Sequence, residues 1–477
     1  LKLRRRLLRQ QRARPQRVLR LQKQLRQKRS NFMKILFISL GCDKNLADSE
    51  EMLGLLTAGG HEITDDETQA DAIVINTCCF IKDAKEESVE TILEMAEYKK
   101  TGSCHALIVT GCLAQRYQKE IIEEVPEVDA VLGTTSYGDI VKALEEAVAG
   151  NHFEEFRDID YLPDTGSKRV LTTGGHFGYL KIAEGCDKHC TYCIIPKLRG
   201  KFRSVPMERL IAQAEDMAEQ GVKELILVAQ ETTVYGKDLY GKKSLHILLK
   251  KLCEIRGIRW IRILYCYPEE IYDELIETIR DEKKICHYLD IPIQHASDRI
   301  LKRMGRRTSK QELIDIVGKL RKEIPDIVLR TTLITGFPGE TEEDHEELKE
   351  FVDEMEFDRL GVFTYSPEEN TPAAEMADQV PEEVKEERRD ELMELQQEIS
   401  YDRGQDRIGQ ELLVMIEGKV ADESAYIGRT YGDAPKVDGY IFVQTGELLM
   451  TGDFAKVRVT GALEYDLIGV LSDEYTE

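Results

Sequence analysis

The sequence contains no run of about 18 apolar residues, so it predicts no membrane-spanning helix. It also lacks an initiator Met and an apolar segment at its start, which excludes a secretory signal there. Hydrophobic residues make up 42% of the 477 residues and aromatic residues 7%, which is typical of a soluble globular protein. A chain of this length predicts roughly two to four domains, and we expect a cytoplasmic location.

The first 31 residues contain no acidic residue and many basic ones. Residues 1–31 hold 3 Lys and 10 Arg, so the rest of the chain carries a net charge of -36 within a total of -23. We interpret residues 1–32 as a basic leader that is non-native or disordered, with Met33 as the true start. An RNA-binding arm and an organellar transit peptide are the alternatives. The acidic body repels nucleic-acid phosphates and suits a basic partner.

The eleven cysteines are an odd number in a long chain without a signal peptide, which argues against a disulfide framework. We expect reduced thiols that bind metals, take part in catalysis or pack in the core.

The order of elements predicts an α/β protein with three folded parts. Residues 33–150 alternate helices with strands, which are expected at Ile35–Ser39, Ala72–Asn76 and Ala106–Thr110, and this order predicts a Rossmann-like parallel sheet. Residues 151–171 are predicted to be a linker, because Gly, Pro and Asp interrupt any periodicity. Residues 172–402 contain six strand-like segments with intervening helices, which predicts an open (β/α)6 barrel. Residues 404–471 contain short strands between turns, which predicts a small antiparallel β-barrel.

The strongest chemical signal is Gly185-Cys186-Asp-Lys-His-Cys190-Thr-Tyr-Cys193. Three thiolates at this spacing can bind three irons of a 4Fe–4S cluster and leave the fourth iron without a protein ligand. S-adenosylmethionine (SAM) can chelate that iron, and an electron from the cluster can then cleave SAM to a 5′-deoxyadenosyl radical. These three cysteines are therefore the candidate catalytic residues. The alternative is a structural zinc site, for which His189 would have to be the fourth ligand.

Five residues near the ends of predicted strands are candidates for binding SAM. Tyr192 precedes the last cysteine, and an aromatic ring there could lie near an adenine or simply pack in the core. Gln230 and Glu231 end a predicted strand, where polar groups could hold the methionine end of SAM. Gly336 and Gly339 end a later strand, where glycines would let the backbone approach a ribose, although an ordinary turn explains them equally well.

A second set of cysteines follows the predicted strands of the first part. Cys42, Cys78 and Cys112 each come one to three residues after a strand, and loops at the carboxyl ends of parallel strands converge on one edge of a sheet. Three thiols there could hold a second cluster, or they could be buried and inert. Cys79 or Cys104 could replace a member of the set.

From Met33 to about Val470 the chain resembles the methylthiotransferase family of radical SAM enzymes. The matching stretches are Ser39-Leu-Gly-Cys-Asp-Lys-Asn-Leu, Asn76-Thr-Cys, Thr110-Gly-Cys-Leu-Ala-Gln-Arg, Lys181-Ile-Ala-Glu-Gly-Cys-Asp, Cys193-Ile-Ile-Pro-Lys-Leu-Arg-Gly, Tyr288-Leu-Asp-Ile-Pro-Ile-Gln-His-Ala-Ser, Met304-Gly-Arg-Arg-Thr and Asp433-Ala-Pro-Lys-Val-Asp-Gly.

The resemblance implies an N-terminal cluster domain, a radical SAM domain and a terminal TRAM domain. It implies that Cys42, Cys78 and Cys112 bind an auxiliary 4Fe–4S cluster, and it selects Cys78 because the family ligand directly follows Asn-Thr. Cys79 stands where the family usually has Gly, and Glu231 where Asp is common.

The chain is most similar to the branch of the family that modifies small-subunit ribosomal protein twelve. The resemblance implies that one SAM methylates sulfur held at the auxiliary cluster. A second SAM yields the radical that removes hydrogen from an aspartate β-carbon, so that the product is 3-methylthioaspartate. The implied partners are that protein, free or in the ribosome, a low-potential electron donor such as flavodoxin or ferredoxin, and a sulfur source, with the enzyme a monomer.

Two other functions are alternatives to the modification of a ribosomal protein. The first is the branch of the family that methylthiolates an adenosine of tRNA. Residues 404–477 hold 14 acidic residues against 6 Lys and Arg, a surface that would resist a polyanion and makes tRNA an unexpected substrate. The second is a non-catalytic zinc or iron–sulfur binding protein.

Overall fold

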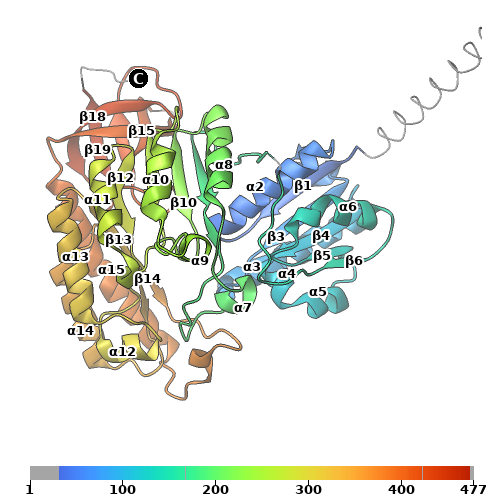
Figure 1. Ribbon diagram of the computed structural model, residues 1–477, viewed down its shortest axis with the longest axis horizontal. Helices are drawn as coiled ribbons and strands as arrows, with labels where there is room; N and C mark the ends of the chain where they lie inside the picture. The colour runs from blue at the N-terminus through green and yellow to red at the C-terminus, as the bar shows by residue number, and fades with distance from the viewer. Residues whose placement is uncertain (1–31, 167, 422, 473–477) are drawn as a thin grey trace, which may run out of the picture.

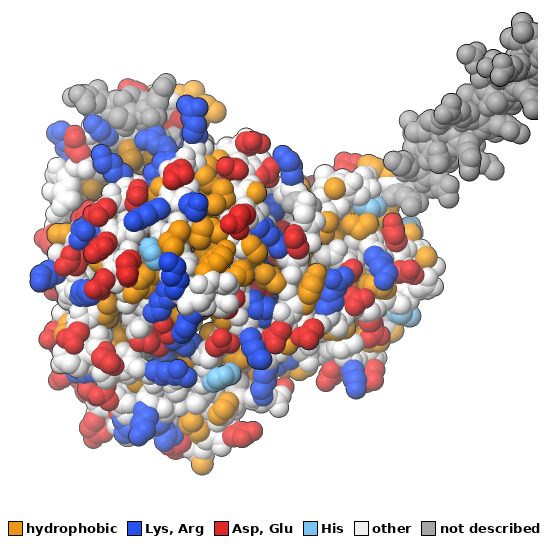
Figure 2. All heavy atoms as spheres, viewed as in Figure 1, with side chains coloured by type: hydrophobic (Ala, Val, Ile, Leu, Met, Phe, Trp, Pro, Cys, Tyr) orange, Lys and Arg blue, Asp and Glu red, His pale blue; other side chains and the backbone are white. Residues whose placement is uncertain are grey.

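The computed structural model describes residues 32–166, 168–421 and 423–472, so the predicted leader up to residue 31 lies outside the described part. Figure 1 shows an N-terminal α/β unit beside a larger central one, with a small β-barrel packed on one end of the central unit. On the face seen in Figure 2, acidic and basic side chains are interspersed over all three parts. Within the described residues, no helix has the length and apolarity needed to cross a membrane.

The N-terminal sheet has six parallel strands in the order β2-β1-β3-β4-β5-β6. Its strands are β1 (Lys34–Ser39), β2 (Glu62–Thr64), β3 (Ala72–Thr77), β4 (Ala106–Gly111), β5 (Ala130–Leu132) and β6 (Phe153–Glu155). Its helices are α2 (Asp43–Ala58), α3 (Lys82–Thr101), α4 (Cys112–Arg116), α5 (Gln118–Glu124) and α6 (Ile140–Val148). Every residue of β3 and β4 is buried, because α3, α4 and α5 cover one face of the sheet and α2 and α6 the other.

Part of the predicted linker is a strand. We predicted residues 151–171 as a linker, but β6 lies within this range and pairs with β5. The end of the range is also fixed in place, since Arg169 donates to the Glu50 carboxylate of α2 at 2.5 Å. Strands of three residues, such as β2, β5 and β6, are too short to show an alternating pattern, which is why sequence analysis missed them.

The central sheet has six parallel strands in the order β14-β13-β12-β11-β10-β7, and its edge strands β7 and β14 do not pair with each other. The sheet is therefore open, as predicted. Its strands are β7 (Phe177–Lys181), β10 (Glu224–Val228), β11 (Trp260–Ile263), β12 (Ile285–Asp290), β13 (Val328–Thr335) and β14 (Arg359–Thr364). The main helices are α8 (Met207–Glu219), α10 (Leu245–Cys253), α11 (Asp273–Asp281), α13 (Lys310–Glu323), α14 (Glu342–Met355) and α15 (Glu382–Gln405).

The C-terminal strands form a closed barrel in the order β15-β16-β17-β19-β18. These are β15 (Glu411–Lys419), β16 (Ala425–Thr430), β17 (Ile441–Gln444), β18 (Phe454–Ala462) and β19 (Leu467–Leu471). The predicted small barrel is confirmed, but β17 and β19 pair in parallel. A closed ring with an odd number of strands cannot be antiparallel at every pairing, so one parallel pair is required.

A buried triad attaches this barrel to the central sheet. Glu224 of β10 accepts hydrogen bonds from Arg262 of β11 and from Arg429 of β16, both at 2.7 Å, and all three side chains are completely buried. Burial alone would raise the pKa of the Glu224 carboxyl, but the guanidiniums of Arg429 and Arg262 outweigh it and lower the pKa.

A capping box begins α13 and gives a test of local stability. The Ser309 side chain accepts from the backbone N–H of Glu312, and the Glu312 carboxylate accepts from the backbone N–H of Ser309. Ser309→Ala should lower the free energy of unfolding by about 1 kcal/mol, because an N–H at the helix start loses its partner. Urea denaturation followed by circular dichroism measures this change. Lys322→Ala on the exposed face of α13 is the control and should change stability by less than about 0.5 kcal/mol.

Candidate active site

The three N-terminal cysteines lie at one edge of the N-terminal sheet. Cys42 follows β1 at the start of α2, Cys78 directly follows β3, and Cys112 begins α4 after β4. These strands are neighbours, so their carboxyl ends bring the three loops together. The loops after β1 and β3 lie close together, since a Cβ built on Gly41 would be 2.8 Å from the Cys78 Sγ.

Two of these three thiols are buried and one is exposed. Burial, together with the neighbouring thiols of Cys112 and Cys42, raises the pKa of the Cys78 thiol to about 12. Burial also raises the pKa of the Cys112 thiol. Cys42 is exposed, so the site formed by Cys42, Cys78 and Cys112, here called the N-terminal thiol site, opens to solvent on that side.

The other cysteines of the N-terminal unit are placed differently. Cys104 precedes β4, at the amino end of the sheet, and its thiol donates to the carbonyl of Ala106 at 3.3 Å. The Cys79 side chain is completely buried in the hydrophobic core beneath α3 and α4, although it lies near Cys112 and Cys78. The choice of Cys78 over Cys79 as a ligand stays a prediction.

The CxxxCxxC segment forms the loop between the short strand β8 (Ala183–Glu184) and helix α7 (Ile195–Arg199). Burial raises the pKa values of the Cys186 and Cys193 thiols to about 12. The Cys190 Sγ lies 3.5 Å from the Tyr267 hydroxyl. We call Cys186, Cys190 and Cys193 the central thiol site.

No three His, Cys, Asp or Glu side chains of the described chain are positioned to hold one metal ion together. A zinc site, including the version in which His189 is a ligand, would need its ligands at a single ion. In a 4Fe–4S cluster each thiolate binds a different iron, so the three sulfurs stand further apart.

Two predicted SAM-binding residues carry buried polar atoms without a hydrogen-bond partner among the described residues. Glu231 is 1% exposed, its Oε2 accepts no hydrogen bond, and Lys188 Nζ lies 3.9 Å away. Burial raises the pKa of the Glu231 carboxyl to about 7. Gln230 donates to Glu184 at 3.0 Å, while its own Oε1 is unpaired. A ligand with N–H donors would satisfy both oxygens.

The two predicted glycines are closed in by the chain's own side chains. Gly336 and Gly339 have φ values of +67° and +82°, which favours glycine at both positions. A Cβ on Gly336 would lie 2.1 Å from Lys385 Cγ, and one on Gly339 would lie 2.5 Å from Asp378 Oδ2. Backbone conformation and packing explain these glycines, and their contact with a cofactor stays a prediction. Tyr192 packs edge to face against Phe337, with ring centroids 6.4 Å apart.

A buried polar network that sequence analysis missed connects the two thiol sites. Arg199 of α7 donates to Asp48 of α2 at 2.8 Å, to Glu184 at 3.1 Å and to Asn45. Glu184 precedes Cys186 by two residues, and the Asn45 Oδ1 lies 3.9 Å from the Cys112 Sγ. The side-chain amide of Asn45 also donates to the carbonyl that precedes Cys78, at 2.9 Å.

Lys181 completes this network by donating to Glu184 at 2.8 Å and to Asp48. Burial alone would raise the pKa of the Glu184 carboxyl, but Arg199 and Lys181 lower it, whereas burial raises the pKa of Asp48. Lys181 could have indicated this network from the sequence, because it ends the otherwise apolar strand β7 and a charge in a buried strand needs a partner.

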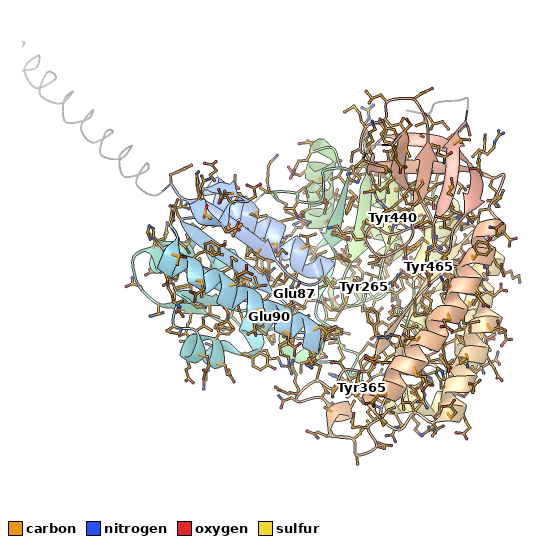
Figure 3. The ribbon with its side chains drawn as sticks, turned by 180° about the vertical axis from the view of Figure 1, so that it is seen from behind. Glu87, Glu90, Tyr265, Tyr365, Tyr440 and Tyr465 are labelled. Atoms are coloured by element: carbon orange, nitrogen blue, oxygen red, sulfur yellow. The ribbon has the colours of Figure 1, made fainter. Side chains whose placement is uncertain are left out.

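Two tyrosines after β11 each lie beneath a buried cation. Lys44 Nζ lies 3.2 Å from the ring centroid of Tyr265, and the Arg306 guanidinium lies 4.3 Å from that of Tyr267. Figure 3 shows Tyr265 where the N-terminal unit faces the central one. These aromatic and cationic residues were not singled out from the sequence, because neither pattern nor spacing pairs them.

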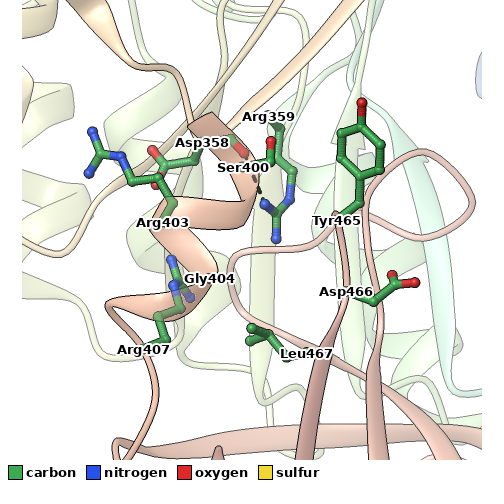
Figure 4. Close-up of a pocket in the computed structure, with 9 residues that line it drawn as sticks. All are labelled: Asp358, Arg359, Ser400, Arg403, Gly404, Arg407, Tyr465, Asp466 and Leu467. Atoms are coloured by element: carbon green, nitrogen blue, oxygen red, sulfur yellow. Dashed lines mark hydrogen bonds between the residues drawn. The ribbon is translucent and has the colours of Figure 1, made fainter. Parts of the chain in front are cut away.

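A small pocket lies elsewhere, where α15 meets the C-terminal barrel (Figure 4). Arg359 and Arg403 line it, but Arg359 pairs with Asp433 and Arg403 with Glu356. Arg359 begins β14, so this pocket is at the opposite end of the central sheet from the thiol sites.

Comparison with known proteins matches each part of the chain to a family. Residues 34–133 match the uncharacterized protein family UPF0004, residues 180–352 the radical SAM superfamily, and residues 408–471 the TRAM domain. The ribosomal protein uS12 methylthiotransferase RimO of Lachnoclostridium phytofermentans is 67% identical over 437 residues, which cover 92% of this chain and 99% of that protein. The chain belongs to the RimO family.

Other RimO proteins agree with this assignment. That of Pelotomaculum thermopropionicum is 53% identical over 92% of this chain and 99% of its own length. That of Clostridium botulinum is 51% identical over 92% of this chain and 98% of its own length. Membership in the radical SAM superfamily implies a 4Fe–4S cluster and SAM for this RimO family member.

Solved structures support the fold. The radical S-adenosylmethionine methyltransferase TsrM from Kitasatospora setae has a TM-score of 0.53 at 13% identity, covering 71% of this chain and 73% of TsrM. The cobalamin-dependent S-adenosylmethionine radical enzyme OxsB has a TM-score of 0.50 at 15% identity, covering 76% of this chain and 56% of OxsB. At these identities the likeness concerns the arrangement of strands and helices alone.

Proposed function

We propose that this chain transfers a methylthio group to the β-carbon of an aspartate in ribosomal protein uS12 and so forms 3-methylthioaspartate. The observation that carries the proposal is the pair of thiol sites, each with three cysteines, connected by the network of Arg199, Glu184 and Asn45. RimO family membership over 92% of the chain supports the substrate, since the relatives are named uS12 methylthiotransferases.

The residues fit the two clusters and SAM that this reaction requires. The proposed ligands of the first cluster are Cys186, Cys190 and Cys193, and those of the second are Cys42, Cys78 and Cys112. Thiols that are protonated when buried can exchange their protons for iron, which couples cluster binding to proton release. When bound, the clusters and SAM would supply the methylthio group and a radical able to remove hydrogen from an unactivated carbon.

The chain's own side chains would hold and orient SAM. Glu231 and Gln230 offer unpaired buried oxygens that suit the ammonium group of SAM. Tyr192 is the proposed neighbour of the adenine, and Gly336 and Gly339 remain proposed contacts through their backbone. Arg306 places a buried positive charge near Cys190, where it would balance the charge of a thiolate-bound cluster.

Charge favours a basic protein over tRNA as the substrate. The C-terminal residues 404–477 carry 14 acidic residues against 6 basic ones, and an acidic surface attracts a basic protein and repels a polyanion. We further propose a cytoplasmic monomer that receives electrons from a low-potential donor such as flavodoxin or ferredoxin and sulfur from a separate source.

Mass spectrometry of both candidate substrates tests the proposal. The protein is reconstituted with iron and sulfide without oxygen, then incubated with SAM, a reductant, and either uS12 or tRNA. We expect uS12 to gain one methylthio group in place of hydrogen on an aspartate, while tRNA nucleosides stay unchanged. Modified adenosine with unmodified uS12 would overturn the substrate assignment, and intact SAM after reduction would overturn the enzyme class.

A further inference from the structure

Lys44 is a buried cation without an anionic partner in the described structure. It lies on α2, two residues after Cys42, and the residue is only 8% exposed. Its Nζ lies over the ring of Tyr265, and no described carboxylate or carbonyl oxygen pairs with it. A cation above an aromatic ring gains less free energy than a buried charge loses by leaving water.

Other buried cations nearby are paired with carboxylates. Lys181 pairs with Glu184 and Asp48, Arg199 pairs with the same two acids, and Arg169 pairs with Glu50. Because a buried charge without a partner is costly, such groups occur where a ligand supplies the missing charge. The unpaired ammonium of Lys44 therefore indicates that an anion binds beside it.

The surroundings of Lys44 point to the substrate as the source of that anion. Cys42 is exposed, so the open side of the N-terminal thiol site is next to Lys44. Tyr265, which lies under the ammonium, follows β11 at the carboxyl end of the central sheet, and its hydroxyl lies 3.4 Å from Asp43. An anion at Lys44 would thus be held between the N-terminal thiol site and the central sheet.

We propose that Lys44 binds the side-chain carboxylate of the aspartate that is modified, an inference that rests on the proposed function. The β-carbon of aspartate is bonded directly to this carboxylate, so anchoring the carboxylate fixes the position of the carbon that is modified. Adenosine has no carboxylate, and a neutral side chain would leave the ammonium unpaired. Lys44 is therefore a specificity-determining residue that selects an acidic side chain.

Lys44→Met tests the inference because it removes the charge and keeps a long side chain. A hydrogen bond to a charged group contributes about 1.5–3 kcal/mol, so kcat/KM for uS12 should fall about 10- to 150-fold. When the target Asp of uS12 is replaced by Asn, wild type and Lys44→Met should have equally low kcat/KM values. Lys44→Met should likewise raise the dissociation constant for the Asp form of uS12 and leave that for the Asn form unchanged. Lys44→Arg should recover part of the loss in kcat/KM and in affinity.

Lys82→Met is the matched control, since it is the same change on the exposed face of α3, where Lys82 makes only a surface ion pair with Glu86. It should leave kcat/KM and affinity unchanged. Equal losses for the Asp and Asn forms, or iron content that falls in Lys44→Met, would show that Lys44 serves the cluster site and would overturn the inference. Wild-type protein that leaves uS12 unmodified would instead overturn the proposed function.

Discussion

Replacing Cys186, Cys190 and Cys193 together by alanine is expected to abolish 5′-deoxyadenosine formation and to leave about four irons bound per chain. The reason is the separation of the two thiol sites. The replaced cysteines belong to the loop between β8 and α7, whereas Cys42, Cys78 and Cys112 come from the edge of a different sheet.

The reciprocal change should give the complementary result. Alanine at Cys42, Cys78 and Cys112 should also leave about four irons, but SAM should still be cleaved on reduction while uS12 stays unmodified. Iron and sulfide analysis, electron paramagnetic resonance of the reduced protein and chromatography of the nucleoside products measure these outcomes.

Cys104→Ala is the control for these cysteine variants. Its thiol is buried in the same unit but lies at the opposite end of β4, so both clusters and full activity should remain. Loss of all iron from either triple variant would show that the two sites do not bind clusters separately. Unchanged iron in either variant would show that its cysteines are not ligands.

Arg199→Met is expected to lower the free energy of unfolding by about 3–5 kcal/mol, because it leaves buried carboxylates with one cation fewer. Asp48 and Glu184 would then share Lys181 alone, and Asn45 would lose its charged partner. The change should also reduce the amount of methylthiolated uS12 formed per 5′-deoxyadenosine, since the network joins the loops that carry the two thiol sites.

Arg169→Met distinguishes an effect on stability from an effect on the product ratio, which is the amount of methylthiolated uS12 formed per 5′-deoxyadenosine. Arg169 is buried like Arg199 and also connects α2 to the central sheet, through Glu50 and the carbonyl of Tyr179 at 2.7 Å. It should cost a similar free energy of unfolding in urea without changing the product ratio at a temperature where the protein is folded. If both variants changed the ratio equally, the network would act only through general stability, whereas partial recovery by Arg199→Lys would support its positioning role.

The strands that could be predicted are those with long apolar runs. Ala72–Thr77 is buried throughout, and Val328–Thr335 alternates buried with half-buried residues over most of its length, so both patterns were visible. The three-residue strands were missed because their pairing depends on neighbouring strands and not on their own residues. For the same reason, β6 could not be separated from the predicted linker.

The local sequence by itself determined the spacing of the central cysteines and the position of the N-terminal cysteines after their strands. Both depend on short stretches of chain, and a thiol that follows a parallel strand must lie at that strand's carboxyl edge. The tertiary structure alone decided the partners of the buried charges, such as Arg199 with Asp48 and Glu184, and the lack of an anionic partner for Lys44 among the described residues. These contacts join residues 15 to 221 positions apart in the sequence, and only the packed chain brings them within the few ångströms over which hydrogen bonds and ion pairs act.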